Sequence, residues 1–145
     1  MFRYDKADES SLTTALDYLY EFFIQHGPFD GILGFSQGSA MATLLARKIS
    51  DQFNDENVAK RLKIILICGI EPPSWDKCPT QLEISSLHLW GASDYILTRS
   101  VNLKSFCFSN GTSKSITFGE GHNIPSMRTG IYPSVKEWIY SALSE

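Results

Sequence analysis

The five residues Gly34-Phe35-Ser36-Gln37-Gly38 carry the clearest chemical signal in this sequence. They fit the G-x-S-x-G pattern, in which a serine stands on a sharp turn between a strand and a helix and presents its hydroxyl as a nucleophile. The flanking sequence agrees, because residues 29–33 form a short apolar strand pattern and residues 39–49 are rich in Ala, Met and Leu, as in a helix. The motif therefore predicts a nucleophilic Ser36.

The turn makes two further demands. A side chain at Gly34 or Gly38 is expected to crowd the backbone that crosses beside it, so the pattern predicts that both glycines of this nucleophile elbow are sterically required. The first amide groups of the following helix, Gln37 first, are expected to point at the space above Ser36, where a negatively charged oxygen would form. The backbone N–H of Gln37 is therefore the candidate oxyanion-hole donor.

A serine hydroxyl is too weak an acid to attack a carbonyl carbon unaided, so it needs a base within reach. His122 follows a predicted strand at 115–118, and Asp94 follows another at 86–90. Serine, acid and histidine in this chain order, with the last two on loops after later strands, match a known arrangement of the catalytic triad. His122 would take the proton of Ser36, and Asp94 would hold the imidazole in the right tautomer.

Each of these residues also has a simpler interpretation. The motif by itself fits a Gly/Ser-rich turn, Asp94 fits an Asx-turn or a helix N-cap, and His122 fits an ordinary loop histidine. His26 and His88 are poorer bases, because the first ends a predicted helix and the second lies in the middle of a predicted strand. The weaker candidates for the acid are Asp30 and Asp76.

The segment from Gly27-Pro28-Phe29-Asp30-Gly31 through Ser39-Ala40 resembles the nucleophile region of the FSH serine hydrolases, a branch of the α/β-hydrolase fold. Gly91-Ala92-Ser93-Asp94 and Gly121-His122-Asn123-Ile124-Pro125 resemble the acid and histidine loops of that family. The resemblance implies hydrolysis of carboxylic esters or thioesters, with neither a metal nor an organic cofactor. Its motif core is shared with acyl-protein thioesterases. Thr98 and Glu120 are mild departures from the family pattern.

Helix and strand patterns alternate along the chain, which predicts an α/β fold with a parallel sheet and helices on both faces. Together with the resemblance, this gives a partial α/β-hydrolase fold of about four strands, as one domain over residues 1–145 that lacks its N-terminal part. The predicted strands are 31–35, 62–68, 86–90 and 115–118, and the predicted helices are about 10–26, 37–51, about 100–108 and 134–143.

Only 35 residues precede Ser36, and they contain one predicted helix, for which residues 8–11 offer caps. No strand and no His-Gly loop fits there, although the resembled fold draws its second oxyanion donor from such a loop. Loss of one donor costs on the order of 100-fold to 1000-fold in turnover. Weak catalysis is therefore expected of this chain alone. The strand before Ser36 is also expected at an open sheet edge, which favours self-association.

Composition bounds the remaining interpretations. The net charge of −3 and the absence of a Lys/Arg cluster argue against nucleic-acid binding. Three cysteines, Cys68, Cys78 and Cys107, favour free thiols in a reducing compartment and argue against a zinc site. Cys68 is expected to pack at a strand end, with a reactive thiol as the alternative. No signal peptide or membrane span is apparent, so the cytoplasm is the expected location, with the nucleus left open.

Two classes of function follow. The first is a serine hydrolase that cleaves small acyl esters or thioesters through Ser36, Asp94 and His122, with an acyl-protein thioesterase as a lower-ranked variant. The second is a catalytically weak or inactive hydrolase-like protein that serves as a binding module. Trp75, in a Pro-rich loop after a predicted strand, is a candidate pocket residue, and a surface loop is the alternative for that segment.

Overall fold

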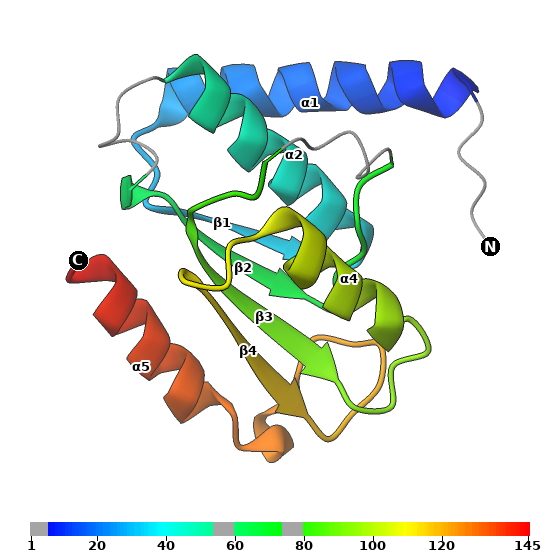
Figure 1. Ribbon diagram of the computed structural model, residues 1–145, viewed down its shortest axis with the longest axis vertical. Coiled ribbons are helices and arrows are strands. Elements are labelled where there is room, and N and C mark those ends of the chain that lie inside the picture. Colours follow the sequence, from blue (N-terminus) through cyan, green and yellow to red (C-terminus); the bar gives the residue numbers. More distant parts are fainter. Residues whose placement is uncertain (1–5, 54–59, 74–79) are drawn as a thin grey trace.

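The computed structural model describes residues 6–53, 60–73 and 80–145 of the chain. Within these residues, four parallel strands form one sheet in the order β1-β2-β3-β4 (Figure 1). In chain order the elements are α1 (Lys6–His26), β1 (Gly31–Phe35), α2 (Gln37–Gln52), β2 (Lys63–Ile67), β3 (Ser85–Gly91), α4 (Leu97–Cys107), β4 (Ser113–Phe118), the 3-10 helix η2 (Met127–Thr129) and α5 (Tyr132–Leu143). This confirms the predicted parallel α/β sheet.

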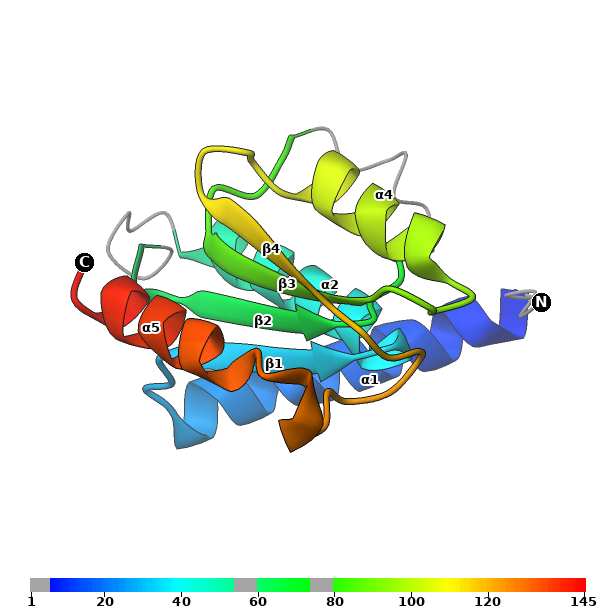
Figure 2. The same cartoon turned by 90° about the horizontal axis from the view of Figure 1, so that it is seen from below.

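The helices lie on both faces of the sheet, as Figure 2 shows from a second direction. Alternate residues of β2 face opposite sides: Ile64 and Leu66 join a core with α2, α4 and part of α1, while Ile65 and Ile67 contact the layer made by α5. Both sets are apolar, because a parallel strand covered on two faces has no side left for water. The two cores thus hold the carboxyl ends of the strands in a fixed relation.

Five elements, α1, β3, α4, β4 and α5, begin earlier than the sequence predicts. The helix α1 begins at Lys6 and not near Ser10, so residues 8–11 lie inside the helix and do not cap it. No Pro or Gly interrupts its first turns, so good helix formers extend it. The helix α4 begins at Leu97, directly after the Asp94 turn, and β4 begins at Ser113, where it pairs with Ser86. The strand β1 has the predicted bounds.

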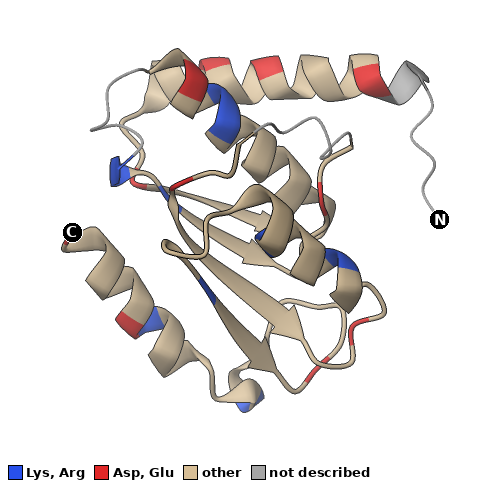
Figure 3. Cartoon of the chain, in the orientation of Figure 1, with Lys and Arg blue, Asp and Glu red and all other residues tan. Residues whose placement is uncertain are grey.

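The two outer strands of the sheet differ in character. β4 carries Lys114 among polar residues, whereas β1 contains no charged residue (Figure 3). The side chain of Leu33 in β1 is 63% exposed. In a parallel ladder alternate residues turn their N–H and C=O groups to one neighbour, so Gly31, Leu33 and Phe35 turn theirs away from β2. The predicted edge position of β1 is confirmed. Charged residues normally protect such an edge, and β1 has none.

Two smaller predictions also agree with the structure. Residues 110–112 form the turn that leads into β4, and Cys68 is buried directly after β2. None of the described helices is both long enough and apolar enough to cross a bilayer.

Candidate active site

Ser36 occupies the turn between β1 and α2 in a backbone conformation that residues other than glycine rarely adopt, with φ 52°. Two hydrogen bonds fix this turn: the Ser36 amide donates to Ile67 O at 2.9 Å, and Ser39 Oγ donates to Gly34 O at 3.0 Å. The hydroxyl is therefore held above the carboxyl end of the sheet, as the motif predicts.

Only one of the two motif glycines is required for steric reasons. A Cβ at Gly34 would lie 2.6 Å from Gly38 O. Because Gly38 O is a backbone atom, this clash could be relieved only if the whole turn moved. A Cβ at Gly38 would meet nothing within 4 Å. The prediction that Gly38 is sterically required is wrong, because it is the backbone of residue 38 that crosses residue 34, while the Cα of Gly38 itself faces open space.

Asp94 lies in the loop between β3 and α4 and is 6% exposed. Its Oδ1 accepts a hydrogen bond from the Ile96 amide at 2.9 Å, which is the Asx-turn that the sequence allowed, and the helix N-cap is Ile96. Burial by itself would raise the pKa of Asp94, but hydrogen bonds from the Ile96 amide, His122 and Cys68 lower it below the usual value. Asp94 is thus an ionised acceptor at neutral pH.

The loop with His122 packs backbone to backbone on the Asp94 loop. The amides of Ala92 and Ser93 donate to Phe118 O at 2.8 Å and Glu120 O at 3.0 Å. A Cβ at Gly91 would lie 2.2 Å from Gly121 O, so only glycine permits this approach. The acid and histidine loops therefore form one unit.

Within the histidine loop, Glu120 stabilises the loop conformation through hydrogen bonds. Its carboxylate accepts hydrogen bonds from the Ser126 amide at 2.8 Å and from Asn123 Nδ2 at 3.3 Å. The bond from the Ser126 amide is the main reason that the pKa of Glu120 is lowered. This carboxylate therefore connects residue 120, before His122, with residues 123 and 126 after it. In the sequence, Glu120 stood out only as a departure from a family pattern.

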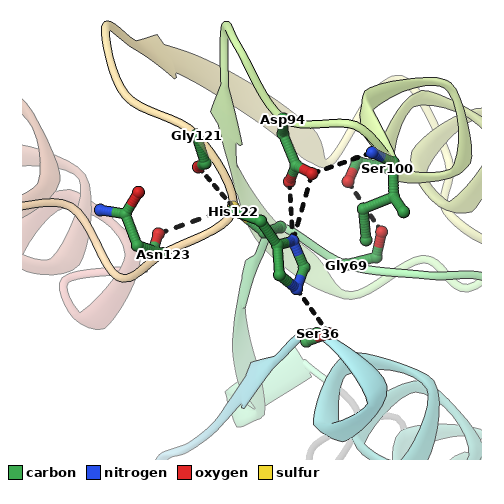
Figure 4. A network of polar contacts seen from close by, with 9 residues as sticks. Ser36, Gly69, Asp94, Ser100, Gly121, His122 and Asn123 are labelled. Atoms are coloured by element: carbon green, nitrogen blue, oxygen red, sulfur yellow. Dashed lines mark hydrogen bonds and ion pairs between the residues drawn. The ribbon is translucent and has the colours of Figure 1, made fainter.

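The three side chains from these loops meet at one point (Figure 4). His122 Nε2 lies 2.9 Å from Ser36 Oγ, and His122 Nδ1 lies 3.0 Å from Asp94 Oδ2 and 3.2 Å from Asp94 Oδ1. With Asp94 ionised, Nδ1–H donates to the carboxylate and Nε2 is left to accept the serine proton. The arrangement can carry out general-base activation of a hydroxyl.

Three further residues surround the imidazole, and sequence reasoning gave none of them a role in this site. The rings of Phe35 and Tyr95 lie with their centroids 5.3 Å and 5.2 Å from that of His122, and Tyr95 is 84% exposed. Cys68 is fully buried beneath the site, with Sγ 3.7 Å from Gly121 O and 3.6 Å from Asn123 O. The available signal was position in the sequence. Phe35 precedes Ser36, Tyr95 follows Asp94, and Cys68 stands at the carboxyl end of the predicted strand 62–68.

The remaining candidates lie elsewhere or outside the described residues. His88 is buried in the middle of β3, 3.1 Å from Ser86 Oγ, and burial lowers its pKa to about 3. His26 ends α1, and Asp30 is exposed before β1. Gln37 is the first residue of α2, where its amide belongs to the helix N-terminus. Trp75 and Asp76 lie outside the described residues.

Comparison with known proteins places the sequence near a group of hydrolases. The pattern of the family described as serine hydrolase (FSH1) matches residues 2–132. Esterase FUS5 of Gibberella moniliformis is 32% identical over 115 residues, which cover 79% of this chain and 47% of that protein. Esterase OVCA2 of Bos taurus is 30% identical over 119 residues, which cover 79% of this chain and 51% of that protein. This chain spans about half the length of these relatives.

Solved structures agree on the fold. A monoacylglycerol lipase of Paleococcus ferrophilus superposes with a TM-score of 0.65 at 12% identity, over 90% of this chain and 76% of that one. A carboxylesterase of Bacillus cereus gives a TM-score of 0.62 at 22% identity, over 93% of this chain and 63% of that one. The partial α/β-hydrolase fold predicted from the sequence is confirmed by these superpositions.

Proposed function

Because the chain belongs to the serine hydrolase (FSH1) family, we propose that it hydrolyses carboxylic esters or thioesters of acyl chains, with Ser36, Asp94 and His122 as its triad. The observation that carries this proposal is the continuous relay from Ser36 Oγ to His122 Nε2 at 2.9 Å and from His122 Nδ1 to Asp94 Oδ2 at 3.0 Å. Such a relay is what a serine needs to act as a nucleophile.

The proposed reaction has two halves. His122 Nε2 takes the hydroxyl proton while Ser36 Oγ bonds to the carbonyl carbon, and the Gln37 amide stabilises the oxyanion. The C–O or C–S bond then breaks, and His122 returns its proton to the leaving group. Water attacks the acyl-Ser36 ester with help from the same base, which releases the carboxylic acid and restores the hydroxyl. Asp94 stays ionised throughout.

The surroundings of the imidazole bear on the substrate. Phe35 and the largely exposed Tyr95 present aromatic rings beside His122. Apolar surface at the reacting centre favours an apolar acyl or alcohol group over a charged one. We therefore propose small apolar acyl esters first and acyl thioesters second. A lipidated protein ranks lower as a substrate, because residues 27–31 resemble the FSH group more than the acyl-protein thioesterases.

A fluorophosphonate probe tests the proposal directly. The parent protein should become covalently labelled, while Ser36→Ala and His122→Ala should lose labelling by at least about 1000-fold, and Asp94→Asn by a comparable factor. Ser134→Ala changes an exposed serine of α5 and serves as the matched control, which should label like the parent. Hydrolysis rates for ester and thioester forms of one acyl chain then separate the two bond types.

The alternative is a binding module without useful catalysis. A folded parent chain that is not labelled, with normal circular dichroism, would favour that alternative. Equal labelling of the parent and Ser36→Ala would remove Ser36 as the nucleophile. Because the chain spans about half the length of its relatives, the same assay with a longer relative sets the reference rate.

A further inference from the structure

We propose that Cys68, Asp94 and His122 form an inhibitory site for a soft divalent cation such as Zn²⁺ or Cd²⁺. The cation would bind between the thiolate, the carboxylate and the imidazole, and would prevent His122 from activating Ser36. Binding itself depends only on the geometry of these side chains, whereas the inhibition rests on the function proposed above.

The three side chains already lie close together. One ligand atom from each of Cys68, Asp94 and His122 falls within 4.8 Å of the other two. His122 Nδ1 is the ring nitrogen that faces the carboxylate, at 3.0 Å from Asp94 Oδ2. Four-coordinate zinc with bonds of about 2.0 to 2.3 Å spaces its ligands about 3.5 Å apart, so shifts of about 1 Å close the site.

The backbone explains why a cysteine reaches this position. Cys68 follows β2 with φ 45°, and its amide donates to Leu89 O at 2.9 Å. This bend turns the side chain toward the acid and histidine loops, where Sγ meets the carbonyl oxygens of Gly121 and Asn123 at 3.7 and 3.6 Å. The thiol is thus directed under the imidazole and away from the α2 side of the sheet.

The donor set selects the type of cation. Sulfur and imidazole nitrogen are ligands of Zn²⁺ and Cd²⁺, whereas Mg²⁺ and Ca²⁺ prefer oxygen. A thiolate and a carboxylate together balance the charge of a divalent ion, which matters because Cys68 is fully buried and Asp94 nearly so. The His122 side chain is 18% exposed, so one of the three ligands is in contact with solvent. Three protein ligands leave the fourth position of a tetrahedral zinc ion to water.

Binding at Nδ1 would reverse the role of the other ring nitrogen. The thiol gives up its proton to solvent when the sulfur binds the metal. The proton on Nδ1 moves to Nε2, so that Nδ1 can offer its lone pair to the cation. Nε2 then carries hydrogen and can only donate, although catalysis needs it to accept the proton of Ser36. No covalent bond of the protein other than S–H and N–H changes, and the inhibition is reversible.

The binding test uses Ser36→Ala as background, so that it needs no activity. Titration calorimetry with ZnCl₂ should give one site per chain, and Cys68→Ser in that background should weaken binding by at least about 10-fold. With CdCl₂, the ultraviolet thiolate-to-cadmium absorbance should appear in the background protein and be lost in Cys68→Ser. Cys107→Ser changes the other buried cysteine among the described residues and is the matched control. Equal affinity with and without the Cys68 thiol would overturn the site.

The inhibition test uses the parent protein and the fluorophosphonate probe. Zn²⁺ should lower the labelling rate at least about 10-fold, EDTA should restore it, and Mg²⁺ should have no effect. Binding that requires Cys68 but leaves labelling unchanged would overturn the inhibitory role. A parent that is not labelled even without metal contradicts the proposed function, while the calorimetry still decides the metal site.

Discussion

The two halves of the candidate site are built differently. The acid–base half consists of β3, β4 and the loops 91–96 and 119–126, which are joined by the amides of Ala92 and Ser93 and by the close approach of Gly91 to Gly121. The nucleophile half consists of β1 and α2, and its strand pairs on one side only, with β2. The two loops of the first half are bonded to each other, whereas the strand of the second half has one unpaired edge.

This difference separates two kinds of dependence. Hydrogen bonds within residues 91–126 position Asp94 and His122 relative to each other, and Cys68 adds contacts to the same loops from β2. Ser36 depends on β1, whose outer backbone groups and Leu33 face solvent. Changes in the acid–base half should therefore act mainly on catalysis, and changes at the edge of β1 mainly on association.

Outside the three proposed catalytic residues, the largest effect is expected from Gly91→Ala. The added Cβ would lie 2.2 Å from Gly121 O, so the acid and histidine loops must separate. Misplacement of a catalytic group by about 1 Å costs about 100-fold in rate, and we expect at least that loss in probe labelling. Gly119→Ala is the matched control, because a Cβ there meets nothing within 4 Å. Similar losses in both variants would contradict this account of the acid–base half.

A second pair tests the nucleophile half. Gly34→Ala places a Cβ 2.6 Å from Gly38 O, and this backbone clash should lower labelling by tenfold or more and reduce the melting temperature. Gly38→Ala has open space and replaces a glycine in a helix with a better helix former, so its stability should equal or exceed that of the parent. If Gly38→Ala is as damaging as Gly34→Ala, the steric account of this turn is wrong.

Acid should weaken the fold through His88, which lies in β3 on the face opposite α5. Burial lowers the pKa of His88 from 6.5 to about 3, so between these values the unfolded chain binds a proton that the folded chain does not. The free energy of unfolding should therefore fall as the pH drops below about 6.5, by up to about 3 kcal/mol at pH 4.

Urea titrations at several pH values measure this effect. His88→Leu should lose most of that part of the pH dependence, whereas His26→Gln, at the exposed end of α1, should keep it. A parent whose unfolding free energy is the same at pH 4 and pH 7 would show that His88 is not a buried neutral imidazole.

The smallest effect on stability is expected at the edge of β1. We expect the parent to self-associate through this uncharged strand, and Leu33→Lys to reduce the association while changing the unfolding free energy by no more than about 0.5 kcal/mol. Ser115→Lys on β4 is the control, because that strand already carries Lys114. Light scattering measures the mass, and a clean monomer for the parent would refute self-association.

Much of this architecture was accessible from the sequence, because the relevant signals are local. β1 is bounded by Asp30 before it and by the Ser36 turn after it, and its predicted ends match the structure. The loops with Asp94 and His122 follow strands that pair in chain order, so their meeting could be expected from the parallel arrangement. Their catalytic role stays a prediction, although the distances are those that the role requires.

Other features could not be read from one sequence. Whether Gly34 or Gly38 needs to be glycine depends on whether the backbone of residue 38 lies against residue 34 or the reverse, and only the three-dimensional structure shows this. The closeness of Cys68 to His122 depends on the strand register and on the positive φ of Cys68. Neither can be inferred from the residue types in the sequence. Tyr95 next to Asp94 was visible in the sequence, but its ring direction was not.

The backbone conformation of Ser36 places stability and the proposed catalysis in conflict. A serine held at φ 52° is strained by about 1 to 3 kcal/mol, and a glycine at this position would not be. Part of the stability that glycine gains in this way is lost again, because the unfolded chain has more conformational entropy with glycine. Ser36→Gly should therefore melt at a higher temperature than Ser36→Ala, which keeps the strained geometry. Because the strained residue is also the proposed nucleophile, a glycine that relieves this strain removes the hydroxyl with it.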